Sequence, residues 1–303
     1  MDTAATTLSQ PVQPVAVEKR GLAAFSELLK PRLTALVLMT TLVGFYLGYP
    51  SPMNYLLMLH TLLGTALVAG GAAALNQLLE REYDAKMKRT AGRPLPTGRL
   101  QPRTVLIYGT TLVTAGLIYL ALAVNLLTSA LGAATLVGYL FVYTPLKRVT
   151  WLNTAVGAIP GALPPLMGWT AARGEITLEG WSLFAILCFW QLPHFLAIAW
   201  MYREDYARGG FVMLPMVDPS GERTGRQAVS YTLGLLPVSL FPYVLKLDGQ
   251  VYLFGALILG VVFLVCAVQF SRRLTLAGAR RLFLISILYL PLLLSLLVLD
   301  KLK

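Results

Sequence analysis

Long apolar segments separated by short polar connections run through almost the whole chain. A helix that crosses a bilayer needs about 20 predominantly apolar residues, and segments near that length recur nine times. They cover approximately residues 31–49, 53–79, 103–124, 126–144, 151–172, 179–201, 227–246, 250–271 and 282–300. The pattern predicts an all-α integral membrane protein with nine transmembrane helices.

The basic residues divide unequally between alternate connections. Connections on one side of the predicted bundle carry 21 Lys and Arg residues, and those on the other side carry four. Because cytoplasmic loops are enriched in Lys and Arg, we expect the basic side, with the N-terminus, to lie in the cytoplasm. An odd number of spans then places the C-terminus outside.

Composition agrees with this interpretation. Of the 303 residues, 56% are apolar and only 13% are charged, whereas soluble domains have about a quarter of their residues charged. A net charge of +11 would suggest nucleic acid for a soluble protein, but here the topology accounts for it, and no nucleic-acid partner is expected. Cys188 and Cys266 lie inside apolar runs, so we interpret them as packing residues without a disulfide or zinc site.

The N-terminal segment is of another kind. It has neither the apolar core of a secretory signal nor the Arg-rich amphipathic pattern of a transit peptide. We therefore interpret residues 1–22 as a disordered cytoplasmic tail and residues 23–303 as a single transmembrane domain. A tail of this kind favours a prokaryotic protein in the plasma or inner membrane.

One polar segment, NQLLEREYDAKMKRTAGRPLPTGRL at residues 76–100, contrasts with its apolar surroundings. Asn76, Glu80 and Asp84 recur every four residues, so they share one face of the helix that leaves the membrane. Repulsion between the carboxylates favours a cation among them, and a dense basic run follows. Carboxylates that hold Mg²⁺, bordered by Lys and Arg, can bind a diphosphate. No glycine-rich phosphate loop is present, which argues against a nucleotide-driven pump.

A second polar cluster ends the predicted span 179–201. Its members are His194, Tyr202, Arg203, Glu204, Asp205, Tyr206 and Arg208. The spans before the two clusters are four apart and point the same way, so both clusters should lie at the cytoplasmic face, around a central cavity that opens there. The span 151–172 is crowded with Gly and Pro and predicts a broken helix lining that cavity. A diphosphate at the mouth of a lipid-bordered cavity suggests an amphiphilic substrate such as a polyprenyl diphosphate.

Three motifs in order carry a family resemblance: DAKMKRTAGRPLPTG, YTPLKRVTWLNTAVGAIPGALPPLMGW and FWQLPHFLAIAWMYREDYARGGFVMLP. With them the chain resembles the intramembrane aromatic prenyltransferases, and among these most closely the protoheme IX farnesyltransferases, or haem O synthases. The resemblance covers nearly the whole chain after the tail.

This resemblance implies a reaction. The farnesyl group of farnesyl diphosphate is transferred to a vinyl group of haem b, and water adds across that vinyl group. The product, haem O, serves terminal oxidases. The implied cofactor is Mg²⁺. The implied partners are membrane lipid and, among proteins, a haem A synthase or a terminal oxidase.

The resemblance also implies roles for individual residues. Asn76, Glu80 and Asp84 match the first acidic motif, in which Glu80 and Asp84 bind the metal. Asp205 is expected to act in the second site as a catalytic residue and metal ligand. Tyr202 and Tyr206 stand where other superfamily members have Asp-x-x-x-Asp, which leaves open whether one or two Mg²⁺ bind. The residues expected to bind diphosphate are Lys88, Arg89, Arg93, Lys147, Arg148, Arg203 and Arg208.

Fewer residues are expected to bind the acceptor, haem b. Trp190, Tyr202 and Tyr206 are expected near the porphyrin. His194 could bind haem iron or accept a proton, although a hydrogen-bonded histidine in a kinked helix is the commoner case. His60 lies in the span 53–79, remote from the acidic motif, and we interpret it as structural.

Two other functions stay open from the sequence. One is a related prenyltransferase that acts on a quinone or chlorin precursor. The other is a transporter that binds haem or an anionic lipid between its two halves.

Overall fold

The computed structural model describes residues 21–50 and 52–302, and its regular structure is helical. The predicted tail lies outside the described residues except for Gly21 and Leu22, and Leu22 already begins the first helix. The helices are α1 (Leu22–Leu28), α2 (Pro31–Gly48), α3 (Tyr55–Asp84), α4 (Pro102–Ala123), α5 (Leu126–Val137), the π-helix η1 (Gly138–Tyr143), α6 (Thr144–Leu146), α7 (Asn153–Arg173), α8 (Leu178–Met201), α9 (Arg203–Arg208), α10 (Leu214–Val217), α11 (Glu222–Val238), α12 (Phe241–Val244), α13 (Gln250–Arg273) and α14 (Leu276–Leu299).

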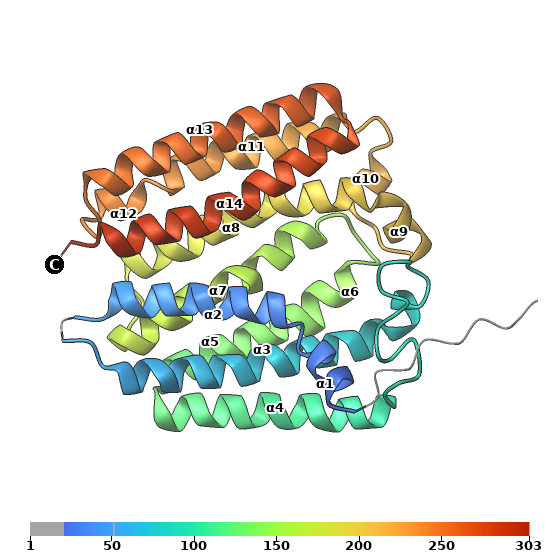
Figure 1. Cartoon of the computed structure of the whole chain (residues 1–303), viewed down its shortest axis with the longest axis horizontal. Coiled ribbons are helices and arrows are strands. Elements are labelled where there is room, and N and C mark those ends of the chain that lie inside the picture. The colour runs from blue at the N-terminus through green and yellow to red at the C-terminus, as the bar shows by residue number, and fades with distance from the viewer. Residues whose placement is uncertain (1–20, 51, 303) are drawn as a thin grey trace, which may run out of the picture.

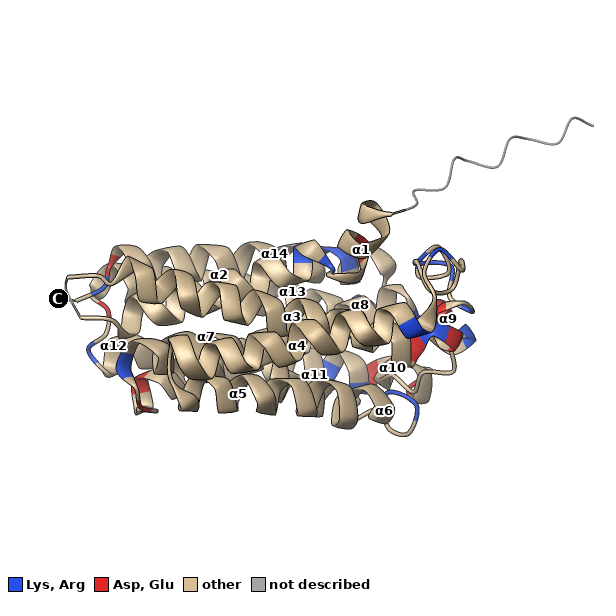
Figure 2. Ribbon diagram, turned by 90° about the horizontal axis from the view of Figure 1, so that it is seen from below, with Lys and Arg blue, Asp and Glu red and all other residues tan. Residues whose placement is uncertain are grey.

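The long helices run side by side in one elongated bundle (Figure 1). Helix α7 packs against α2, α5 and α8. Helices α11 and α14 pack against α8, and α13 packs against α11 and α14. The short helices α1, α9 and α10 lie at one end, and α12 lies near the C-terminus at the other (Figure 1). Figure 2 shows that the Lys, Arg, Asp and Glu residues gather at the two ends and leave the middle of the bundle without charged residues.

Seven of the described helical segments are long and apolar enough to cross a membrane. They are α2, α3, α4, the continuous segment Leu126–Leu146, α8, α13 and α14. They match seven of the nine predicted spans, and they fit a multi-pass membrane protein. The other two predicted spans correspond to α7 and to α11 with α12. Helix α7 contains several Gly and Pro residues, and α11 is only 17 residues long and begins with charged groups, so the count of nine is not confirmed.

The Gly- and Pro-rich segment forms one continuous helix, so the predicted break is wrong. Pro160, Pro164 and Pro165 all lie inside α7 and are buried. Each proline lacks the N–H group that an α-helix uses for its hydrogen bonds. Helix α7 nevertheless stays continuous because it packs against neighbouring helices, as proline-containing helices do in membranes.

Glycines on both helices, Gly44 of α2 and Gly168 of α7, allow the two backbones to approach closely. A Cβ atom built on Gly168 would lie 1.9 Å from the carbonyl oxygen of Thr41, and one built on Gly44 would lie 2.0 Å from that of Pro165. Both positions therefore require glycine, because small residues let helix backbones meet in a bilayer.

We expect Gly168→Ala to lower the free energy of unfolding by about 1–3 kcal/mol, because the new methyl group overpacks the α2–α7 seam. Thermal unfolding of the purified protein in detergent measures this. Gly92→Ala is the matched control, since a Cβ there meets no atom within 4 Å. Equal midpoints for the two variants would contradict the close α2–α7 contact.

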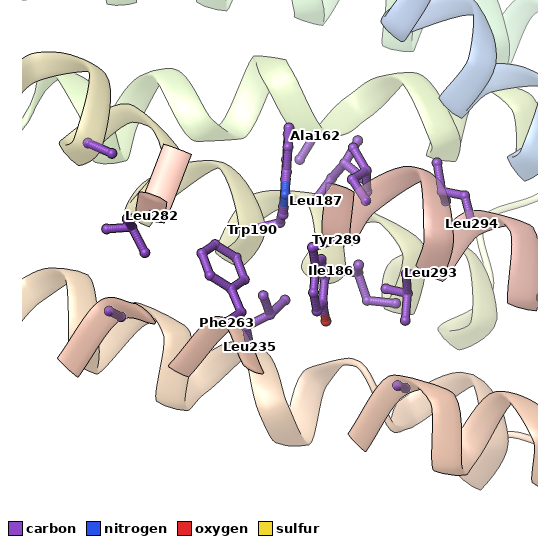
Figure 3. Packing of buried hydrophobic residues seen from close by; sticks show 14 of the residues in the cluster. Ala162, Ile186, Leu187, Trp190, Leu235, Phe263, Leu282, Tyr289, Leu293 and Leu294 are labelled. Carbon is purple, nitrogen blue, oxygen red and sulfur yellow. The ribbon is translucent and has the colours of Figure 1, made fainter. Parts of the chain in front are cut away.

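The largest apolar core surrounds α8. In Figure 3, Trp190 and Leu187 of α8 lie near Ala162 of α7, with Tyr289 of α14 and Phe263 of α13 close by. Cys188 and Cys266 are free and pack against this core, as the sequence predicts.

Candidate active site

The last turns of α3 present the predicted polar face. Asn76, Glu80 and Asp84 are buried, with exposed fractions of 1%, 6% and 1%. Ionised groups in such surroundings need partners, because an unpaired buried charge is very costly. The structure supplies one cationic partner for each of the three side chains.

The three cations come from three separate segments of the chain. The Nζ atom of Lys30 donates to Oδ1 of Asn76 at 2.8 Å, and that of Lys147 donates to Oε1 of Glu80 at 2.7 Å. A guanidinium N–H of Arg93 donates to Oδ2 of Asp84 at 2.6 Å. Basic groups from other segments therefore face the polar side chains at the C-terminal end of α3, a combination that suits a diphosphate–metal site.

The π-helix η1 positions Lys147. It widens the helix just before Thr144, whose hydroxyl donates to the carbonyl of Tyr139 at 2.8 Å and accepts a hydrogen bond from the Asn76 amide at 3.1 Å. The Nζ atom of Lys147 then lies 4.5 Å from the ring centroid of Tyr143. Short π-helices of this kind are frequent at functional sites.

Lys30 is the site residue that sequence reasoning missed. It immediately precedes α2 in a Lys-Pro-Arg sequence and adopts φ +46°, a conformation that non-glycine residues rarely adopt. Burial and the positive charge of Arg93 lower the pKa of Lys30 to about 7. A basic residue before a span is ordinarily interpreted as a topology signal. Only the contact between Lys30 and Asn76 shows that Lys30 belongs to the site.

A cavity of about 510 Å³ adjoins these cations. It opens between the α1–α2 junction and the loop after α3, and Lys30 and Arg93 form part of its wall. The remaining lining residues are Glu27, Pro31, Arg32, Leu33, Gln77 and Pro94. An anionic group would therefore meet the basic side chains of Lys30, Arg32 and Arg93 on an otherwise mainly apolar wall, beside the acidic face of α3.

Asp205 binds the loop that follows α3. Its carboxylate accepts the backbone N–H groups of Lys88 at 3.0 Å and Arg89 at 3.2 Å, and it pairs with the Arg208 side chain. Partial burial opposes ionisation, but these hydrogen bonds hold the pKa of Asp205 below its usual range. The carboxylate therefore stays ionised at neutral pH. Its contacts would be lost only as the pH falls through that lowered pKa.

Asp205→Asn should loosen the loop that carries Lys88 and Arg89, because the amide cannot accept all three hydrogen bonds as a carboxylate does. We expect the folded variant to lose about 1.4 kcal/mol of local stability in this loop. Trypsin should therefore cleave the loop about tenfold faster than in the wild type. Glu204→Gln, at the exposed neighbouring position, is the control. Equal cleavage of the two variants would contradict the role of Asp205 in holding the loop.

The remaining predicted cations contact aromatic rings. Arg89 lies over Tyr202 and Tyr206, with its guanidinium carbon 5.4 Å and 5.8 Å from their ring centroids. Arg148 lies over Tyr83 at 4.7 Å, and Arg203 lies over Trp200 at 4.9 Å. Arg89 and its two tyrosines thus extend the basic side of the site toward α9.

The sequence profile of the UbiA prenyltransferase family matches residues 37–293, which include the acidic face of α3 and the end of α8. The chain belongs to this family.

Curated relatives narrow the family assignment. The chain is 52% identical over 286 residues to a protoheme IX farnesyltransferase of Solibacter usitatus, covering 91% of this chain and 98% of that protein. It is 44% identical to a protoheme IX farnesyltransferase of Koribacter versatilis, covering 97% of this chain and 99% of that protein. These matches confirm the resemblance to protoheme IX farnesyltransferases.

Solved structures agree on the fold. A digeranylgeranylglyceryl phosphate synthase structure has a TM-score of 0.78 at 16% identity and covers 92% of this chain and 98% of that chain. A UbiA homologue of Archaeoglobus fulgidus bound to GPP and Mg²⁺ has a TM-score of 0.64 at 15% identity and covers 90% and 99%. The bundle described above is therefore the fold of the UbiA family.

The donor set of this UbiA protein suits a hard cation. Glu80 and Asp84 offer carboxylate oxygens one helical turn apart, and Mg²⁺ takes one or two carboxylates together with phosphate oxygens. Among the described residues, no three His, Cys, Asp or Glu side chains come together as one metal site. Asp205 is hydrogen-bonded to the loop after α3 in this structure, and its role as a metal ligand stays a prediction.

The predicted acceptor residues fall into two places. Tyr202 and Tyr206 lie beside Arg89, whereas Trp190 is buried in the α8 core and its indole N–H donates to the carbonyl of Ser286 at 2.7 Å. His194 lies next to Trp190, with the two ring centroids 5.1 Å apart. His60 is hydrogen-bonded to the hydroxyl of Tyr119 at 2.6 Å, in line with a structural role.

Proposed function

We propose that this protein transfers the farnesyl group of farnesyl diphosphate to a vinyl group of haem b, and that water adds to the same vinyl group to give haem O. The observation that carries the proposal is the buried face of Asn76, Glu80 and Asp84, opposed by three cations, in a chain whose full-length relatives are protoheme IX farnesyltransferases.

The cations of the site bind the diphosphate. Lys30, Lys147 and Arg93 are already directed at the acidic face of α3, and Lys88 and Arg89 follow on the loop that Asp205 holds. As the carbon–oxygen bond breaks, negative charge accumulates on the leaving diphosphate. Preorganised cations in a site with little water stabilise that charge more strongly than water does.

Glu80 and Asp84 would hold Mg²⁺. When bound, the ion supplies further positive charge for the leaving group. Because their carboxylates are buried and one turn apart, these residues can exchange their Lys147 and Arg93 partners for metal and phosphate without a change in the backbone of α3. Asp205 then acts through the loop, which favours a single carboxylate pair over two metal sites.

The apolar interior serves the other half of the reaction. An allylic farnesyl cation survives only where water is scarce. The middle of the bundle has no charged residues in Figure 2 and contains the large apolar core around α8. The electron-rich vinyl group of haem b captures the cation. Water then adds to the new cationic carbon beside the porphyrin and releases a proton to solvent or to the departing diphosphate, which leaves a hydroxyl group. We place the farnesyl chain and the acceptor in a central cavity below the cytoplasmic end.

The proposed topology follows the basic residues. With α7 and α11–α12 counted as crossings, the chain has nine transmembrane helices, an N-terminus in the cytoplasm and a C-terminus outside. The diphosphate site then faces the cytoplasm of a prokaryotic plasma or inner membrane. The product would pass to a terminal oxidase, directly or through a haem A synthase.

Mass spectrometry of the products tests the reaction. Purified protein is incubated with haem b, farnesyl diphosphate and Mg²⁺, and we expect a farnesylated and hydrated haem that is absent when EDTA removes the metal. Prenylation of a quinone precursor, with haem unchanged, would overturn the acceptor. Haem counterflow across proteoliposomes without chemical change would support a transporter and overturn the reaction.

A further inference from the structure

The second candidate site lies between α8 and α14, where His194 is held in one orientation. Its Nδ1 atom is 2.7 Å from the hydroxyl of Ser286. The ring stacks between Trp190, with a centroid separation of 5.1 Å and an interplanar angle of 23°, and Phe283, with values of 5.1 Å and 29°. Trp190 is itself fixed by its hydrogen bond to the Ser286 carbonyl. Ser286 thus orients both rings.

The hydrogen bonds around Ser286 determine which ring nitrogen carries the proton. The Ser286 hydroxyl donates its only proton to the carbonyl of Phe283 at 2.6 Å. Toward His194 the oxygen can therefore act only as an acceptor, so Nδ1 must be the donor. The Nε2 atom of the imidazole then carries no proton and keeps its lone pair. A histidine that binds a metal through one nitrogen commonly donates the other N–H to a fixed acceptor in this way.

The Nε2 atom of His194 has no hydrogen-bond partner among the described residues. It is also not among the polar atoms that are completely buried without a partner. His194 lies seven residues before Met201 at the end of α8, a rise of about 10 Å. An axial ligand at this depth places a porphyrin within the apolar half of the bundle, near the cytoplasmic end that carries the diphosphate site.

We propose that Nε2 of His194 is an axial ligand of the iron of haem b, and that Ser286 fixes the tautomer and orientation required for this. Trp190 and Phe283 keep the ring from turning, so the position of the porphyrin, and with it that of the vinyl group, is set by α8 and α14. The inference rests on the proposed function, because haem b is the acceptor there.

Absorption spectroscopy of haem b titrated into the purified protein tests the ligation without relying on turnover. His194→Ala should shift the Soret band and raise the dissociation constant for haem b by tenfold or more, and added imidazole should restore the wild-type spectrum. Ser286→Ala keeps the backbone carbonyl that binds Trp190 and removes only the hydroxyl. We expect it to raise the dissociation constant by about tenfold, the usual cost of losing such an orienting group.

His60→Ala is the matched control. His60 is the other histidine of the chain and also has its Nδ1 hydrogen-bonded to a hydroxyl group, so its loss should leave spectrum and affinity unchanged. The ligation is refuted if folded His194→Ala gives the wild-type Soret band. If that variant does not fold, wild-type affinity in Ser286→Ala refutes it. Product formation by the wild type, measured in parallel, separates these results from a failure of the proposed function, which would show as no farnesylated haem at all.

Discussion

Asp84→Asn is expected to slow the formation of farnesylated haem by about 100-fold or more, the usual cost of removing one preorganised electrostatic group. The amide has nearly the shape of the carboxylate but lacks its charge, so it cannot hold a divalent cation against a diphosphate. It also leaves Arg93, whose guanidinium group lies 2.6 Å from Asp84 in the wild type, without its anion. The rate is measured by mass spectrometry of the haem products.

Glu82→Gln is the control for this variant. Glu82 belongs to the same helix, its side chain is 73% exposed, and its ion-pair partner is the neighbouring Arg81. The change removes the same charge from the surface, and we expect no loss of rate. An Asp84→Asn protein that unfolds at the wild-type temperature and retains full activity would show that the acidic face of α3 does not take part in the reaction.

Lys147→Met is expected to have the largest effect on stability. The Lys147 and Glu80 side chains are only 12% and 8% exposed, and removing one member of a buried ion pair leaves the other charge uncompensated, at a cost of about 3–5 kcal/mol. Thermal and denaturant unfolding in detergent measure this loss. Activity should fall as well, because the variant lacks a cation beside the diphosphate.

A second substitution separates stability from catalysis. Glu80→Gln in the Lys147→Met background removes the uncompensated carboxylate, so the double variant should regain most of the lost unfolding free energy. It should remain inactive, because both the cation and a metal ligand are missing. A double variant as unstable as Lys147→Met would mean that the two side chains are not paired in the folded protein.

The sequence predicted the acidic half of the site because a four-residue spacing on a helix is a local property. Asn76, Glu80 and Asp84 share a face in any α-helix, and the structure adds that this face is buried. The roles of Lys30 and Asp205 are not local. Lys30 reaches Asn76 across 46 positions, and Asp205 reaches Lys88 across 117. No periodicity encodes such contacts, so the sequence could not predict that Lys30 bonds to Asn76 or that Asp205 bonds to the loop after α3.

Helix α7 shows that local sequence patterns also fail to predict parts of the fold that depend on long-range packing. Its prolines predicted a break, since local backbone preferences oppose a helix there. Close packing against α2, with Gly44 and Gly168 at the seam, overrides that preference. The hydrophobic pattern identified the long apolar helices, which depend on composition over some 20 residues. It could not foresee which of the polar or Gly-rich segments would be held straight by neighbours.

The tyrosine pair beside Arg89, Tyr202 and Tyr206, affects which acceptor charge this part of the site can tolerate. Haem b, the proposed acceptor, carries two propionate groups, and carboxylates at the positions of Tyr202 and Tyr206 would repel an acidic acceptor that approached them. Two phenol rings with a guanidinium group over them present a neutral and cationic border instead. Acceptors without acidic groups have no such requirement, and the exchange of carboxylates for phenols is thus a feature suited to a dianionic ring system.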